Sequence, residues 1–157
     1  MKMTCIAAAL AALTALNAQA YDINSAADIN VDANGLILRG FDATTYQSKS
    51  QPAGGTGEHT AAFEGAIYRF GSAVQREIFV ASPGKFAPVF NGFCALAAAH
   101  GRKVDADPQA YRLIEGRLYV FASQGAAQAW DKDVLGNLAK ADANWPRIRS
   151  KTPKELN

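Results

Sequence analysis

Polar and hydrophobic residues alternate in two pairs of short segments, and a Glu-Gly dipeptide separates the members of each pair. The first pair covers residues 60–63 and 66–70, and the second covers residues 111–114 and 117–121. Alternation with a period of two predicts strands, and a two-residue connection that contains glycine predicts a hairpin turn. The pattern therefore predicts two short β-hairpins.

Helical spacing begins after the first hairpin. Ser72 followed by Gln75 matches a capping box, which marks the start of a helix. Val74, Ile78 and Ala81 then form an apolar stripe at helical spacing, so we expect this face to be buried. The Ser-Pro-Gly sequence that follows predicts the end of the helix.

Three more helices are predicted further along the chain. Residues 93–100 are rich in alanine, the best helix former. Ser123 is placed to cap a helix that reaches about Trp130. The last helix has an apolar stripe of Val134, Leu138, Ala141 and Trp145, and Pro146 is expected to end it.

Short hairpins mixed with helices, without long βαβ crossovers, predict a small single-domain α+β fold. No internal repeat is evident from the sequence. The apolar positions of the predicted elements nominate a core that should be largely buried, comprising Phe70, Phe79, Leu118, Val120, Leu138 and Trp145.

The first 20 residues follow a different pattern. Lys2 gives a positive start, residues 6–16 are almost entirely apolar, and Ala18-Gln19-Ala20 has the small-x-small form that signal peptidase recognises. The apolar run is shorter than the roughly 20 residues of a membrane-spanning helix. We therefore predict a signal peptide cleaved after Ala20, a periplasmic or secreted protein, and no membrane span after cleavage.

Composition narrows the class of protein. The hydrophobic fraction of 49% excludes a disordered chain, and a net charge of +2 argues against a strongly basic nucleic-acid binder. The predicted organisation is a signal peptide at 1–20, an N-terminal arm at 21–34, one domain at 35–147 and a basic C-terminal tail at 148–157, expected to be frayed.

Cys94 is the first candidate for chemistry, because removal of the leader also removes Cys5. The predicted helix places Cys94 in its first turn, where the helix dipole favours a thiolate. A thiolate there suits a soft metal ion or a redox reaction. A buried cysteine that acts as a small hydrophobic residue is the alternative.

Two histidines are candidate partners of this thiol. Cys94 and His100 would lie about 120° apart around one helix, so His59 is the better partner in a composite metal site. The sequence contains no C-x-x-C, H-E-x-x-H, P-loop or G-x-S-x-G motif. We therefore expect a binding protein rather than an enzyme.

Several segments, taken together, resemble the bacterial secreted YHS-domain family, which is related to the TRASH-like metal-binding domains. They include the Gly-Phe-Asp opening, the Glu-Gly hairpins, the Gly-Phe-Cys-Ala segment and the Asn-Trp-Pro sequence near residue 145, and the resemblance covers about residues 35–147. It implies a role with copper or another soft transition metal. Gly71 and Gln75 stand where metal-binding relatives carry cysteines, so Cys94 is the one ligand retained.

These observations predict a periplasmic ligand-binding domain that holds a soft metal, of the copper type, through Cys94 and His59. Its partner would be a metal ion or another protein. Two alternatives remain open: a thiol-based redox protein that uses Cys94 without metal, and a structural or interaction module in which Cys94 is buried.

Overall fold

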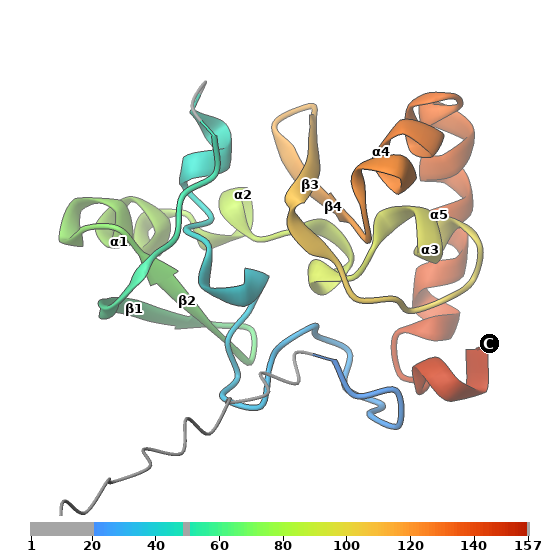
Figure 1. Ribbon diagram of the computed structural model, residues 1–157, viewed down its shortest axis with the longest axis horizontal. Coiled ribbons are helices and arrows are strands. Elements are labelled where there is room, and N and C mark those ends of the chain that lie inside the picture. The colour runs from blue at the N-terminus through green and yellow to red at the C-terminus, as the bar shows by residue number, and fades with distance from the viewer. Residues whose placement is uncertain (1–20, 49–50, 157) are drawn as a thin grey trace, which may run out of the picture.

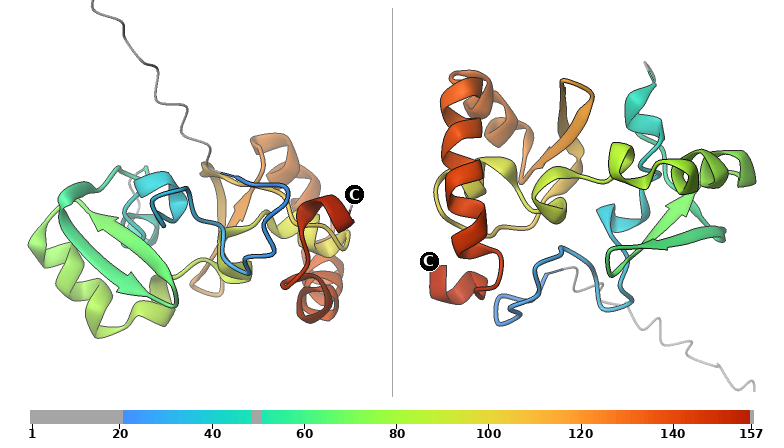
Figure 2. Two further views of the ribbon diagram at one scale, coloured as in Figure 1. Left: turned by 90° about the horizontal axis from the view of Figure 1, so that it is seen from below. Right: turned by 180° about the vertical axis from the view of Figure 1, so that it is seen from behind.

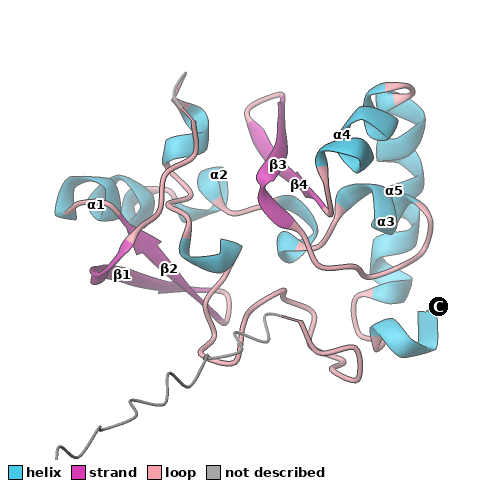
Figure 3. Cartoon of the chain, in the orientation of Figure 1, coloured by secondary structure: helices cyan, strands magenta, loops and turns pink. Residues whose placement is uncertain are grey.

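The computed structural model describes residues 21–48 and 51–156. It confirms a small α+β fold of two antiparallel hairpins packed with helices (Figures 1 and 3). Its strands and α-helices are β1 (Thr56–Phe63), β2 (Ala66–Phe70), α1 (Ala73–Ala81), α2 (Pro83–Phe86), α3 (Ala95–Ala99), β3 (Asp107–Ile114), β4 (Arg117–Phe121), α4 (Gln124–Asp131) and α5 (Val134–Ile148). Short 3-10 helices are η1 (Leu38–Gly40), η2 (Thr45–Gln47), η3 (Val89–Gly92) and η4 (Pro153–Leu156).

Each predicted hairpin leads into a capped helix, as the sequence indicates. β1 pairs with β2, and the Ser72 hydroxyl then accepts a hydrogen bond from the Gln75 N–H at the start of α1. β3 pairs with β4, and the Ser123 hydroxyl accepts one from the Ala126 N–H at the start of α4. Both β1 and β3 begin earlier than predicted. Each strand pairs with its partner again on the far side of a register shift, at Thr56 in β1 and at Asp107 in β3.

The two halves of the fold repeat one motif, so the expectation of no internal repeat is wrong. Both hairpin turns place Glu and then Gly at positive φ, and both ladders shift register at the equivalent place, between Thr56 and Thr60 and between Asp107 and Tyr111. Before each hairpin, three consecutive residues ending in glycine have positive φ, in η1 and in η3. The shared backbone defines a first half from η1 to α2 and a second half from η3 to α5.

Each half has its own core. In the first half, Phe79 packs against Tyr68 and Phe70 at ring separations of 4.5 and 5.0 Å. In the second half, Trp130 occupies the equivalent helix position and packs against Tyr119 and Phe121 at 5.9 and 5.5 Å. Phe70, Phe79, Leu118 and Val120 are buried as predicted, whereas Leu138 and Trp145 are only half-buried.

The expected apolar stripe of α1 is not buried. Val74 is 64% exposed and Ile78 is 48% exposed, whereas Phe79 is buried. The aromatic contacts of Phe79 with β2 decide which side of this nine-residue helix faces the hairpin. Val74 and Ile78 then lie on the other side.

The helix expected at residues 93–100 is shorter than predicted, and the last helix is longer. Positive φ angles in η3 and extended backbone at Phe93 delay the start of α3, so Cys94 is its N-cap residue. Pro146 lies inside α5 and does not end it. Its missing N–H removes one backbone bond in the last turn, and the Arg149 N–H still bonds the Trp145 carbonyl at 3.0 Å.

Lys103 holds the arm at 21–34 and the C-terminal segment together. The prediction that the tail is frayed is therefore wrong. The fully buried Lys103 ammonium donates to the carbonyls of Ala27, Arg149 and Lys151 at 2.6, 3.0 and 2.8 Å. The Lys154 N–H donates to the Ile23 carbonyl, and Figure 2 shows η4 beside the arm. One buried cation therefore joins three segments of the chain.

The predicted signal peptide, residues 1–20, lies outside the described residues. Among the helices of residues 21–48 and 51–156, none is long and apolar enough to cross a bilayer.

Candidate functional site

Cys94 lies in a turn between η3 and α3 and is 2% exposed. Its N–H donates to the Val104 carbonyl at 2.9 Å, and its carbonyl accepts from the Ala98 N–H at 3.0 Å. The side chain belongs to the core cluster of the second half and makes no capping hydrogen bond. Because α3 has only five residues, its dipole offers little stabilisation to a thiolate.

The internal repeat gives Cys94 a counterpart in the first half, Asp42. The Asp42 N–H donates to the Ala53 carbonyl at 2.8 Å, as the Cys94 N–H does to Val104. The Asp42 carboxylate is fully buried and accepts hydrogen bonds from the Thr44 N–H, the Thr44 hydroxyl and the Gly71 N–H at 2.9, 2.6 and 2.9 Å. In the first half, therefore, the residue at this position holds the turn in place.

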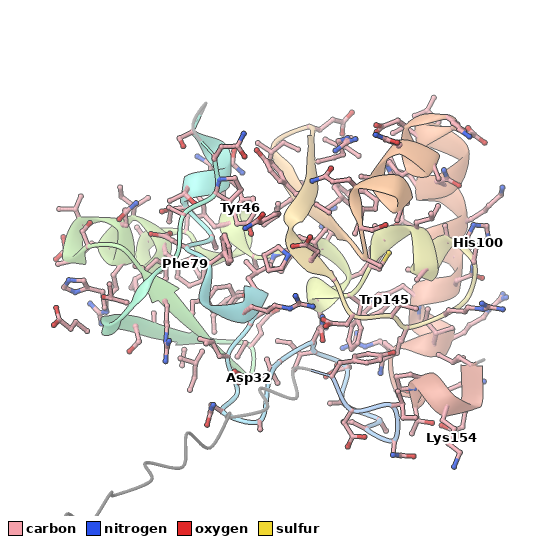
Figure 4. The ribbon with its side chains drawn as sticks, in the orientation of Figure 1. Asp32, Tyr46, Phe79, His100, Trp145 and Lys154 are labelled. Atoms are coloured by element: carbon pink, nitrogen blue, oxygen red, sulfur yellow. The ribbon has the colours of Figure 1, made fainter. Side chains whose placement is uncertain are left out.

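The structure does not bring Cys94 together with either histidine in a metal site. His59 is half-buried on β1 in the first half, and Figure 1 shows β1 and α3 in opposite parts of the molecule. His100 is exposed after α3, at the outer edge of the second half in Figure 4. In the described part of the chain, no group of three or more His, Cys, Asp and Glu side chains is placed to hold a metal ion.

A cleft between the two halves is a different candidate. It has a volume of about 350 Å³ and is bounded by the end of the first hairpin, the connection from α2 through η3, the start of β4, and α5. Its lining residues are Phe63, Glu64, Gly84, Ala87, Pro88, Val89, Phe90, Asn91, Arg117, Asp142 and Trp145. We call this the inter-half cleft.

Aromatic side chains from both halves line the inter-half cleft. Trp145 packs against Phe90 and Phe93 at ring separations of 5.6 and 6.0 Å. Phe63 belongs to the first half and packs against Phe79 at a ring separation of 6.1 Å. Trp145, predicted as core, is half-buried because it also lines the cleft, and Figure 4 places it in the second half.

Three charged side chains also line the cleft: Glu64, Arg117 and Asp142. All three are exposed, and none forms a hydrogen bond or an ion pair with the described residues. Two of these charges act on the pKa of the neighbouring Tyr119 hydroxyl. Burial raises the pKa of Tyr119, Arg117 lowers that pKa, and Asp142 raises it.

This combination suits the binding of a small molecule. Ligand sites typically combine apolar and aromatic walls with a few polar groups that fix orientation, and their volumes begin at about 300 Å³. The sequence does not reveal the cleft, because the aromatic residues that line it have the spacing of core positions. Its charged residues resemble an ordinary solvated surface, and Glu64 joins Arg117 and Asp142 at the cleft only when the two halves pack together.

A larger cavity, of about 620 Å³, lies under the N-terminal arm. All but two of its lining residues belong to the arm itself, and the exceptions are Phe93 and Pro153. This cavity is the space that the arm encloses as it crosses the body of the molecule. It is a weaker candidate, because the arm supplies most of its walls, whereas separate elements of both halves line the inter-half cleft.

Comparison with known proteins finds no matching family model, no matching curated protein and no matching solved structure.

Proposed function

We propose that this protein is an extracytoplasmic ligand-binding module that holds a small organic molecule with an aromatic or apolar body in the inter-half cleft. The observation that carries the proposal is the meeting of Phe63, Phe90 and Trp145, from both halves, around one cleft with unpaired charges. The aromatic walls supply apolar contact area, and the charges supply orientation. Export rests on the leader-like pattern of residues 1–20.

The surroundings of Cys94 favour the structural interpretation of this residue over a metal or redox role. Cys94 is 2% exposed, and its counterpart Asp42 secures the same turn in the first half. Soft-metal binding through Cys94 and His59 would require the second core to open and the two halves to rearrange. We therefore place the ligand site in the inter-half cleft.

The relationship to the YHS-domain family remains part of the proposal. The segments that resemble the family lie in both halves, and they include the positive-φ turns and the Glu-Gly hairpins on which the fold depends. These segments account for the repeated backbone and do not identify a ligand.

A test uses Gly84, which lines the cleft and where an added Cβ would meet no other part of the protein within 4 Å. Gly84→Leu should narrow the cleft without a clash in the core. Gly125→Leu is a matched control, because Gly125 lies outside the cleft and a Cβ there meets only an ordinary contact with Ser123.

The probe is 3-phenylpropanol, which is neutral and carries one aromatic ring. Its titration, followed by amide and indole NMR shifts, should perturb Val89, Phe90 and Trp145 in the wild-type protein and in Gly125→Leu. The same titration of Gly84→Leu should give shifts at least several-fold smaller. Shifts confined to other regions, or equal in both variants, would contradict the proposed site.

A further inference from the structure

We propose that the ligand of the inter-half cleft is a zwitterion: a small molecule that carries an ammonium group, a carboxylate and an aromatic or apolar body, as an apolar α-amino acid does. This inference rests on the proposed function, because it assigns the ligand class of the same cleft. It is drawn from the charges that line the cleft and from their lack of partners in the described chain.

Arg117 is the group that recognises an anion. Its guanidinium presents a planar fork of donors that matches a carboxylate, and no acidic residue of the described chain lies within ion-pair distance of it. The three ion pairs of the described chain involve other arginines: Arg39, Arg112 and Arg149. Arg117 is therefore available to a ligand at the edge of an apolar cleft.

The internal repeat shows that the hairpin does not need an arginine at this position. Ala66 follows the Glu-Gly turn of the first hairpin just as Arg117 follows that of the second. Ala66 is buried, and Arg117 is exposed and lines the cleft. The two turns have similar positive φ angles, so the turn itself does not require the arginine.

Glu64 and Asp142 are the groups that recognise a cation. Their carboxylates come from the first hairpin and from α5, and both line the cleft together with the aromatic side chains. An ammonium group near Trp145 or Phe90 would also be attracted to the ring faces. With two carboxylates and one guanidinium, the lining complements a ligand that carries both signs of charge.

The experiment compares four probes that share a phenylpropyl-like body and differ in charge. They are phenylalanine, phenethylamine, 3-phenylpropionate and neutral 3-phenylpropanol. We expect phenylalanine to bind at least about tenfold more tightly than each of the others, since each additional charge-assisted contact in a partly apolar site contributes to affinity.

Variants then assign the two charged contacts. Arg117→Gln should remove the advantage of phenylalanine over phenethylamine, because the carboxylate loses its partner. Glu64→Gln and Asp142→Asn should reduce the advantage in affinity of phenylalanine over 3-phenylpropionate. Glu115→Gln and Arg147→Gln are matched controls: Glu115 holds the same turn position in the second hairpin, Arg147 lies on α5, and neither lines the cleft.

The outcomes separate the two proposals. If 3-phenylpropanol binds in the cleft and phenylalanine binds no more tightly, the ligand class is wrong and the cleft function stands. If the charge variants leave the preference for phenylalanine unchanged, the assignment of a zwitterion to these residues is overturned. If none of the four probes perturbs the cleft, both the function and the ligand class are refuted.

Discussion

Cys94 and Asp42 occupy equivalent turns, and each supports its turn in a different way. The Asp42 carboxylate bonds the Gly71 N–H at the start of the first capped helix, whereas the Cys94 thiol packs into an apolar cluster. In the sequence the cysteine is the more conspicuous of the two, because thiols are reactive. Its burial depends on tertiary packing, which the local sequence does not reveal.

We predict that Cys94 resists alkylation by iodoacetamide in the folded protein and reacts once the protein is unfolded in urea. Cys94→Ser should lower the free energy of unfolding by about 1–3 kcal/mol, because it buries a hydroxyl without a partner. Cys94→Ala should cost less than Cys94→Ser. Rapid alkylation of the native protein, together with Cu(I) binding that Cys94→Ser abolishes, would contradict the structural role.

Lys103 is the second residue whose role depends on tertiary structure. Its ammonium bonds three carbonyls and lies 4.8 Å from the centre of the Phe93 ring. Lys103→Met should leave those carbonyls unpaired and cost about 1–3 kcal/mol or more. Hydrogen exchange should show faster exchange in the arm and in the C-terminal segment.

Lys154→Met is the control for this change, because the Lys154 side chain is exposed and only its backbone N–H bonds the arm. Equal melting temperatures and equal exchange in Lys103→Met and Lys154→Met would rule out Lys103 as the residue that joins these segments.

At the scale of elements, the features that sequence predicts well are local. Both hairpin turns depend on a Glu-Gly pair at positive φ, and both following helices depend on a serine N-cap. The exposed stripe of α1, the passage of α5 through Pro146 and the half-buried Trp145 depend on which partner each element meets. Patterns within one element do not contain that information.

The two caps give a paired prediction. Ser72→Ala and Ser123→Ala should each lower the free energy of unfolding by about 1 kcal/mol, because each removes a side-chain acceptor for a helix N–H. The effects should add in the double variant, since the caps lie in separate halves and share no bonding partner. Urea denaturation of the four proteins provides the measurement, and a double variant no less stable than either single variant would contradict independent caps.

At the scale of the whole molecule, the internal repeat is the main feature that was not predicted, although both hairpins carry the same Glu-Gly-x-x-Tyr-x-Phe-x-Ser sequence. The two halves share their positive-φ turns, hairpins and capped helices, yet their cores are filled differently, with Phe79 in one and Trp130 in the other. The same turns recur because they impose positive φ, whereas the rest of each half has diverged in side-chain size and charge. The cleft arises only where the two diverged halves meet.

Two buried tyrosines and one half-buried tyrosine predict the response of the whole molecule to alkaline pH. Burial raises the pKa of Tyr21 to about 12 and raises the pKa values of Tyr46 and Tyr68 still further above the ordinary value of 10. Above pH 10 the unfolded chain releases these protons and the folded chain retains them. These groups should leave stability unchanged below pH 10. Above it, stability should fall by about 1.4 kcal/mol per pH unit for each of the buried Tyr46 and Tyr68, and by less for the half-buried Tyr21.

Lys103 acts in the opposite direction over a lower range. Burial lowers its pKa, partly offset by Asp28, so its contribution makes stability rise as the pH approaches 10.5 and then levels off.

Absorbance at 295 nm and circular dichroism should show tyrosine ionisation and unfolding together above pH 10. Complete ionisation near pH 10 with an intact fold would contradict the buried tyrosines.

The most direct test of the central claim is to locate a bound aromatic ligand in the folded protein. With phenylalanine at saturating concentration, intermolecular nuclear Overhauser effects should join its ring protons to the Val89 methyl groups and the Trp145 indole, both of which line the inter-half cleft. Overhauser effects to Ile23 and Ile29 instead would place the ligand under the arm and contradict a binding site between the two halves.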